Sequence, residues 1–440
     1  MLTQEQAATI AEKILALSKA DDVEVSISSG RSSNLRFARN SVSTSGSASD
    51  TSINVSSTFG KQSGSASVNQ TDDATLADVV HRAEALAKLS PEDEEYLSPP
   101  GAQQYPSVKA YADGTAGLTP EARALIAKDC IDEALAKKVV TAGFIESEES
   151  FALIANSKGL RASHRSTGIA YSVTARTTDG TGSGWGGGGH TDAAKMDGAA
   201  ISRRAITKAL SSANAKAVEP GKYTVILEPE AVSNLMGNFA SRLDARSADE
   251  GRSYFSEAGG KNKIGQKLFP EFVTIVSDPS HPDAPGNPWG EDGLPASRTA
   301  WIENGVLKNL RYSRFWAARK CVHAVLSPAN TIMEGGTASV DDLIASTDRG
   351  ILITRFWYIR DVDPKTMLLT GLTRDGSFWI ENGKIVYPVK NFRFNESPVA
   401  MLKNIDMMSK PFRMQSGGSA NLIPALKVKE FTFSSLSDAV

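Results

Sequence analysis

The segment Pro220-Gly-Lys-Tyr-Thr-Val-Ile-Leu-Glu-Pro-Glu-Ala231 marks the point at which the chain changes character. Pro220 and Gly221 end the preceding element, and the apolar run over residues 223–227 that follows them predicts a short strand. A helix is predicted from residue 230 to about residue 242. We therefore expect a domain boundary here, with an N-terminal domain over residues 1–219 and a C-terminal domain over residues 220–440.

The chain after this segment has the pattern of a strand-rich domain. Short strands are separated by Asn304-Gly305, Asp375-Gly376 and Asn382-Gly383, which are dipeptides typical of tight hairpin turns. Alternating apolar residues over 431–436 predict a last strand. The second half is therefore predicted to be mainly β-structure.

The chain before it mixes helices with an antiparallel sheet. Thr3 and Gln6 have the spacing of a capping box before an amphipathic helix, and residues 73–89 return to a helical period. Between these helices, four short alternating segments predict strands, with Gly60-Lys61 at a hairpin tip. Residues 1–89 are thus predicted to form an α-β-β-β-β-α unit.

A second unit is predicted over residues 119–219, after a proline-rich linker over residues 90–118. Thr119-Pro120 supplies a cap and a first helical residue, and Cys130 lies on the apolar stripe of the helix that follows. A hairpin turns at residues 156–159, and residues 192–210 look helical. The expected fold class is α+β, with an N-terminal antiparallel sheet carrying helices and a strand-rich C-terminal domain.

Composition excludes several classes of function. The chain has 440 residues, and its 48 Lys and Arg nearly balance 50 Asp and Glu, which argues against a nucleic-acid partner. Residues 1–20 lack the apolar run of a signal peptide, and no later run is long enough to span a membrane. The two cysteines are isolated, which fits a reducing compartment. We expect a cytoplasmic protein.

Four local features resemble functional sites. The glycine-rich residues 180–190 contain a nominal GxGxxG, but a close-packing loop is favoured over a nucleotide site. Glu146, Glu148 and Glu149 read as a solvated bend rather than an acid and base pair. His323, close to Cys321, reads as core, and the five scattered histidines do not form a zinc pattern.

Several blocks of the second half carry a resemblance to the TldD/PmbA family, also described as modulators of gyrase and as two-subunit metalloproteases. The N-terminal half is similar in the order of its elements and in Gly64-Ser-Ala-Ser-Val-Asn69. The resemblance therefore covers nearly the whole chain. The matching blocks lie at residues 156–159, 220–231, 292–295, 302–306, 349–355, 376–383 and 387–390.

The resemblance also indicates what this chain lacks. One branch, TldD-like, has a zinc-binding HExxxH motif on the helix after the Pro-Gly strand and a cysteine near the C-terminus. Matching the motif's glycine to Gly237 puts Ser233 and Asn234 at the His-Glu positions and Asn238 at the second His. Serine and asparagine are poor zinc ligands, and residues 415–419 contain no cysteine. We expect no catalytic residue, no metal ligand and no cofactor on this chain.

The resemblance implies a zinc-free, PmbA/TldE-like subunit that acts on unfolded or modified peptides at a partner's zinc. The partner would be a TldD-like zinc subunit in a heterodimer, or a second copy in a homodimer; no membrane and no nucleic acid are expected. Aromatic residues that look exposed favour a dimer, although a plain hydrophobic core explains them equally well; they are Phe315, Trp316, Phe356, Trp357 and Tyr358. The alternatives are a non-enzymatic peptide-binding or scaffolding homodimer and an independent hydrolase using Glu230 or His323.

Overall fold

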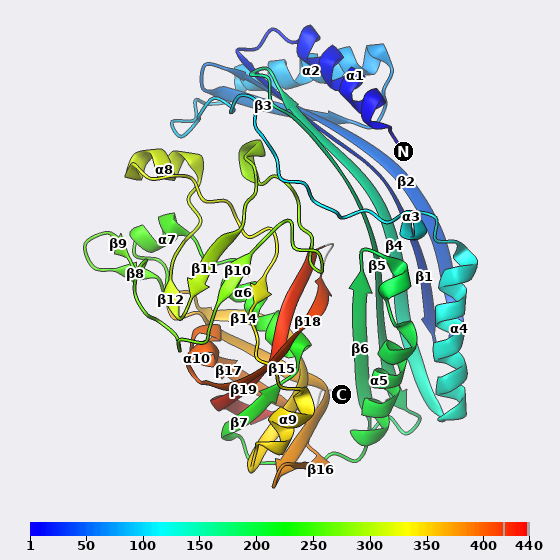
Figure 1. The fold of residues 1–440 in the computed structure, drawn as a ribbon. Helices are drawn as coiled ribbons and strands as arrows, with labels where there is room; N and C mark the ends of the chain where they lie inside the picture. Colours follow the sequence, from blue (N-terminus) through cyan, green and yellow to red (C-terminus); the bar gives the residue numbers. More distant parts are fainter. Residues whose placement is uncertain (417–418, 438–440) are drawn as a thin grey trace.

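The computed structural model describes residues 1–416 and 419–437. Two large sheets dominate it, and the fold class is α+β as expected. Figure 1 shows a long curved sheet, with the C-terminal half of the chain on its concave side and helices on its outer side. This antiparallel sheet has the order β3-β2-β1-β4-β5-β6. Its strands are β1 (Asp22–Ala38), β2 (Ser41–Phe59), β3 (Gln62–Val68), β4 (Val139–Asn156), β5 (Arg161–Thr177) and β6 (Ser183–His190).

The first strand is longer than predicted. The alternating segments around Val25 and Phe37 belong to one strand, β1, because Gly30 and its polar neighbours continue the extended backbone between them. Residues 1–89 are therefore an α-β-β-β-α unit, and the predicted fourth strand was wrong. The turn at Gly60-Lys61 is confirmed, since β2 and β3 pair antiparallel on either side of it.

Two pairs of helices bury the outer face of this sheet. Helices α1 (Gln4–Leu17) and α2 (Asp73–Leu89) cover one end, and α4 (Pro120–Ala136) and α5 (Gly198–Ser211) cover the other. The capping box of Thr3 and Gln6 and the Thr119 cap are confirmed. Cys130 is fully buried, as predicted. Helix α5 starts later than predicted because residues 193–195 form the 3-10 turn η1.

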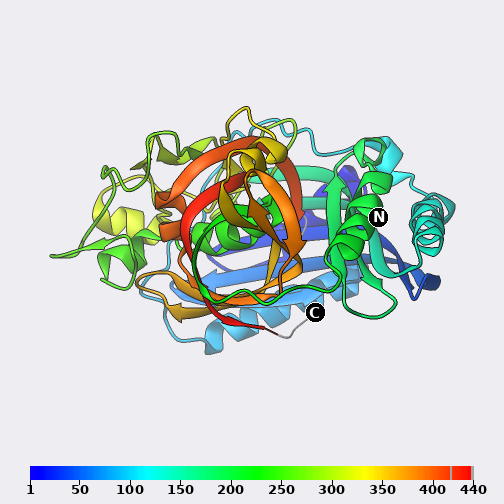
Figure 2. The ribbon, with the colours of Figure 1, turned by 90° about the horizontal axis from the view of Figure 1, so that it is seen from below.

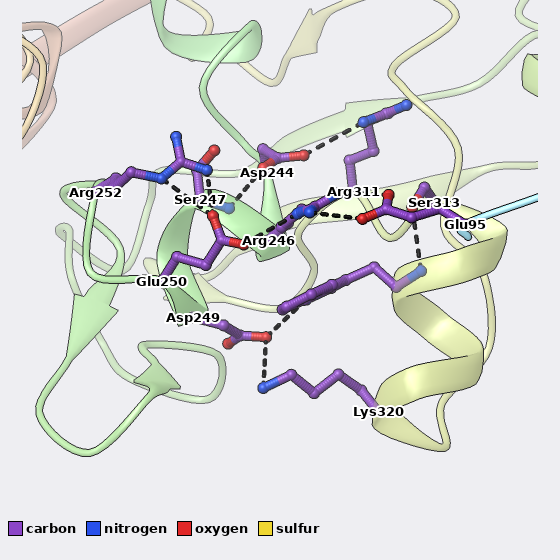
Figure 3. A network of polar contacts seen from close by, with 11 residues as sticks. Glu95, Asp244, Arg246, Ser247, Asp249, Glu250, Arg252, Arg311, Ser313 and Lys320 are labelled. Atoms are coloured by element: carbon purple, nitrogen blue, oxygen red, sulfur yellow. Dashed lines mark hydrogen bonds and ion pairs between the residues drawn. The ribbon is translucent and has the colours of Figure 1, made fainter. Parts of the chain in front are cut away.

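The linker over residues 90–118 contains one short helix, α3 (Asp113–Ala116), and otherwise irregular backbone. Its carboxylate Glu95 accepts two hydrogen bonds from Arg246, at 2.7 and 2.8 Å. Figure 3 shows this contact within a polar network around α7 (Ala245–Asp249) and α8 (Arg314–Lys320). Further along, the Tyr105 hydroxyl donates to the Gly293 carbonyl at 2.7 Å. The linker is thus fastened to the C-terminal half.

The C-terminal half is an eleven-stranded sheet that curves around one helix, α6 (Pro229–Ala240), as Figure 2 shows. Leu235, Met236 and Phe239 of α6 are fully buried in its core. The sheet contains β7 (Gly221–Leu227), β10 (Ile275–Ser277), β11 (Thr299–Glu303), β12 (Val306–Leu307), β13 (Ile332–Met333), β14 (Arg349–Asp363), β15 (Leu368–Glu381), β16 (Lys384–Pro388), β17 (Phe392–Glu396), β18 (Ile405–Ser416) and β19 (Ser419–Leu436). The remaining elements are β8 (Ser256–Glu257), β9 (Lys261–Asn262), η2 (Glu291–Gly293), α9 (Val340–Ala345) and α10 (Pro398–Lys403).

Predicted turns in this half were mostly right. Asn304-Gly305 and Asn382-Gly383 both connect paired strands, and the last alternating strand lies within β19. Asp375-Gly376 is an exception, because it lies inside β15, where φ values of 58° and 117° accompany an irregular register against β14. These two residues bend a strand rather than end it.

Three other expectations were wrong. The glycine-rich stretch is the strand β6, and Glu146, Glu148 and Glu149 lie within β4 rather than on a bend. Cys321 and His323 are exposed after the end of α8, so they are not core. Of the five aromatics, Trp316 and Phe356 belong to the core, Phe315 is half-buried, and only Trp357 and Tyr358 are exposed.

None of the helices in the described ranges is both long and apolar enough to cross a membrane. The predicted domain boundary between residues 219 and 220 would separate two independently folding units, and it stays a prediction.

Candidate functional site

A cleft of about 400 Å³ lies between the two halves of the chain. One wall is β6 with α5, and the other is the start of α6 with β18; Figure 1 shows β6 facing β18 across the middle of the molecule. The cleft carries aromatic, basic and acidic side chains together, which include Trp185, His190, Lys208, Glu228, Glu230 and Arg413. It therefore offers contacts to both backbone and side chains of a ligand.

The strand β6 can form this wall because of its glycines. A Cβ on Gly184 would lie 2.2 Å from the Ala205 carbonyl oxygen, and one on Gly186 would lie 2.2 Å from that of Ile201. Helix α5 thus packs directly on the strand backbone. The prediction of close packing is confirmed, although the segment is a strand and not a loop.

The outer edge of β6 borders the cleft at Trp185 and at Gly187, which is buried beside the Trp185 ring. Ser183 bonds through its backbone N–H to the Ser212 hydroxyl at 2.9 Å, and the Gly189 carbonyl accepts from Arg413. Odd-numbered residues of β6 therefore direct their backbone groups away from β5. Between Ser183 and Gly189, the backbone groups of Trp185 and Gly187 have no partner within the described part of the chain. An extended peptide can pair with such an edge.

A buried ion pair forms the base of the cleft. The ammonium of Lys208, on α5, pairs with Glu228 and donates to the Thr354 hydroxyl at 2.8 Å. Only 13 % of the Lys208 side chain and 17 % of the Glu228 side chain are exposed. Burial lowers the pKa of Lys208, while Glu228 opposes this shift. The pair fixes α5 against the start of α6.

His190 completes this wall at the end of β6. Its Nδ1 accepts a hydrogen bond from the backbone N–H of Asp192 at 2.9 Å, and burial lowers the pKa of the imidazole. Burial favours the neutral ring, and acceptance of a hydrogen bond by Nδ1 leaves the proton on Nε2. A neutral imidazole in the cleft can donate one hydrogen bond to a ligand.

The residues predicted at the lost motif lie on α6. The Asn234 amide donates to Glu230 Oε1 at 3.2 Å and accepts from the backbone N–H of Phe356 at 3.1 Å. Asn238 donates to the Asn234 carbonyl at 3.0 Å. Ser233 is half-buried and forms no side-chain hydrogen bond within the described residues. The structure therefore brings Asn234 and Asn238 together and uses their amides inside the protein.

This donor set does not fit a zinc ion. Over residues 1–416 and 419–437, no three His, Cys, Asp or Glu side chains gather at metal-binding distance. The nearest carboxylate on the helix, Glu230, has its pKa raised by burial, and the asparagine amides are poor ligands. Residues 415–419 occupy the region where the family resemblance expects a cysteine, and this sequence has none there. Their side chains lie outside the described ones.

Sequence reasoning missed most of the cleft. Lys208, Glu228 and Arg413 carried no local pattern, because their partners are far away along the chain. A signal for β6 was present, however: glycine recurs at positions 182, 184, 186 and 188. A period of two with glycine on one face indicates a strand against a closely packed helix.

Three family models match successive parts of the chain. They describe domain 1, the central domain and the C-terminal domain of the PmbA/TldA metallopeptidases, and match residues 23–87, 115–213 and 220–435. Together they account for most of the chain.

Several curated relatives are named as metalloproteases. A metalloprotease of Methanothermobacter thermautotrophicus is 27 % identical over 63 % of this chain and 63 % of its own length. A zinc metalloprotease TldD homolog of Saccharolobus solfataricus is 24 % identical over 45 % of this chain and 46 % of its own. The chain thus spans less than two thirds of the length of these relatives.

Solved structures share the fold. TldE from Thermococcus kodakarensis superimposes with a TM-score of 0.87 at 18 % identity, over 98 % of this chain and 100 % of that one. A protein from Thermotoga maritima described as a modulator of a DNA gyrase gives a TM-score of 0.86 at 19 % identity, over 97 % and 100 %. At these identities the likeness concerns the fold alone.

Proposed function

This chain belongs to the PmbA/TldA metallopeptidase family, and we propose from this premise that it is a zinc-free, PmbA/TldE-like subunit of a two-subunit peptidase. In this proposal the zinc belongs to a TldD-like partner. The chain contributes one side of a chamber in which an unfolded or modified peptide is held and cleaved.

The proposal rests on the hydrogen bonds that the side chain of Asn234 makes on α6. At the positions that the family resemblance assigns to the zinc motif, Asn234 holds β14 and Glu230 by hydrogen bonds. An amide engaged in this way supports a structural use of the helix. It can neither bind zinc strongly nor act as the general base for a metal-bound water.

The cleft supports the peptide part of the proposal. Backbone pairing with the edge at Trp185 and Gly187 does not depend on the side chains of the peptide. It therefore suits substrates of varied sequence. A folded domain presents few free backbone groups, and unstructured chains are therefore favoured. Lys208, Glu228 and Arg413 leave charged groups of both signs around the bound segment.

The test is to purify the chain alone, without a metal-binding tag, and to measure zinc per chain together with peptidase activity. We expect less than about 0.1 zinc per chain and no cleavage of an unfolded polypeptide. Cleavage should appear when a TldD-like zinc subunit from the same organism is added, and a chelator should abolish it.

Three results would contradict the proposal. Near one zinc per chain would mean that a ligand set lies elsewhere in the protein. Cleavage by the isolated chain that survives strong chelators would favour an independent hydrolase. A stable dimer of this chain that binds peptide, but gains no activity from any TldD-like subunit, would favour the scaffolding homodimer.

A further inference from the structure

A polar band crosses the helix-covered face of the six-stranded sheet. On β1, apolar side chains around Val25 pack under α1 and α2, and those around Phe37 pack under α4 and α5. Between the two clusters the same face of the sheet carries polar side chains, namely Ser29, Arg31, Ser33, Ser147, Glu149, Arg165 and Thr167. Neither pair of helices covers this band with apolar groups.

A cavity of about 350 Å³ lies in the band, beneath the segment that joins α3 to α4. Hydroxyl groups and two arginines line most of it. They belong to Arg31, Ser33, Ser47, Thr115, Arg123 and Ser147. This lining is polar and carries charges of both signs, since Glu148 and Glu149 also belong to it, in contrast to the apolar clusters on either side.

Arg123 is the unusual member of this lining. It is only 2 % exposed, and its Nη1 donates to the Leu118 carbonyl and to the Ser147 hydroxyl, both at 3.1 Å. Its buried Nε has no acceptor, and no carboxylate in the described ranges forms an ion pair with it. Burial lowers the pKa of this guanidinium. A buried cation with neutral partners only is costly unless an anion compensates it.

The nearby carboxylates form no ion pair with Arg123 within the described residues. Glu149 also lines the cavity, but it already pairs with Arg31 at 3.2 Å and Arg165 at 3.4 Å, and accepts from the Tyr111 hydroxyl at 2.7 Å. Glu148 also lines the cavity, but its side chain alternates to the opposite face of β4. Glu121 lies at the exposed start of α4, and its charge only partly opposes the lowering of the Arg123 pKa by burial. The band thus holds more positive than negative charge.

We propose that this cavity binds a small molecule through a carboxylate or phosphate group, with the guanidinium of Arg123 as its anchor. A guanidinium matches the planar or tetrahedral oxygens of such groups, and the surrounding serine and threonine hydroxyls can donate to the remaining oxygens. The cavity shares no lining residue with the cleft between the halves. The proposal is therefore independent of the peptidase role.

The experiment uses the intact chain and two probes, inorganic phosphate and acetate, each titrated calorimetrically against sodium chloride of equal ionic strength. We expect saturable binding of at least one probe. Arg123→Met should weaken it roughly tenfold or more, since a hydrogen bond to a charged group is lost. Arg82→Met, at an exposed arginine on α2 that pairs with Asp78, is the matched control and should bind as the unaltered chain does.

A second variant tests the proposal even if Arg123→Met fails to fold. Ser47→Phe adds a ring on the sheet side of the cavity while Arg123 stays in place, and it should also abolish binding. Binding of phosphate alone or acetate alone would support the proposal and identify the group. Absence of saturable binding of both probes, or unchanged affinity in either variant, would overturn it.

Discussion

The side chain of Asn234, on α6, accepts a hydrogen bond from the backbone N–H of Phe356, on β14, at 3.1 Å. This contact joins the central helix to the sheet at the position where the family resemblance expects a zinc motif. Phe356 is only 3 % exposed, so its N–H has no access to bulk water. The amide therefore has a structural task that a histidine or glutamate at this position would not perform in the same way.

Asn234→Ala should lower the free energy of unfolding by about 1–3 kcal/mol, because the Phe356 N–H would be left buried without an acceptor. Asn238→Ala is the matched control on the same helix. Its amide donates to a helix carbonyl at 3.0 Å, and alanine is a better helix former, so a change below about 0.5 kcal/mol is expected. Urea unfolding of both variants checks this, and equal effects would contradict it.

Lys208→Met should destabilise the protein by on the order of 2–3 kcal/mol, because Glu228 would keep a mostly buried charge without its cation. The estimate is below that for fully buried pairs, since 13 % and 17 % of the two side chains are exposed. Lys128→Met removes one partner of an exposed pair, whose side chains are 66 % and 56 % exposed. That control should change stability by less than about 0.5 kcal/mol. Thermal unfolding of both variants distinguishes the two cases.

Glu230→Gln should change the pH dependence of stability in a predictable direction. Burial raises the pKa of Glu230 above its unfolded value, so the folded state retains this proton longer. The stability contributed by the neutral carboxyl is present below the unfolded pKa and is lost as pH rises through the folded pKa. Relative to the unaltered chain, the variant should therefore gain stability as the pH rises from below the ordinary pKa of a glutamate to above the raised pKa of Glu230.

The measurement for Glu230→Gln is urea unfolding at several pH values, taken as the difference between variant and unaltered chain. The Gln side chain still accepts from Asn234, so the hydrogen bond at 3.2 Å is retained. Glu12→Gln, at an exposed position on α1, is the matched control for the change of side chain. A slope of opposite sign for Glu230→Gln would show that its carboxyl is stabilised in the charged form.

Gly184→Ala should strongly destabilise the N-terminal half. The new Cβ would lie 2.2 Å from the Ala205 carbonyl oxygen and 2.4 Å from the Ala209 nitrogen, both in the backbone of α5. Overpacking of this kind costs about 1–3 kcal/mol or more. Gly237→Ala, in α6, meets nothing within 4 Å and should instead stabilise the helix by about 0.5–1 kcal/mol. Circular dichroism melts of both variants check the opposite signs.

Peptide binding at the edge of β6 should depend on the backbone of the ligand. A flexible peptide should lose most of its affinity when alternate amides are N-methylated on the face that pairs with Trp185 and Gly187. The same peptide methylated on the other amides is the control and should bind as before. Fluorescence anisotropy measures both affinities, and equal binding of the two peptides would exclude strand pairing.

Local patterns predicted most of the elements. The capping box at Thr3, the cap at Thr119 and the turn at Gly60-Lys61 were readable because each depends on residues only a few positions apart. Asp375-Gly376 was wrongly predicted as a hairpin turn because that prediction also used only neighbouring residues. The dipeptide has the left-handed backbone of a turn, but pairing with β14 on both sides keeps it inside β15.

The alternating strands, the capped helices, the strand-rich second half and the family therefore follow from the sequence alone. The cleft and the polar cavity were decided by the tertiary structure. Glu228 and Thr354 lie 20 and 146 positions from Lys208, and the Ser147 hydroxyl lies 24 positions from Arg123. Such contacts depend on strand register and on how helices pack across a sheet, which short-range periodicity does not specify.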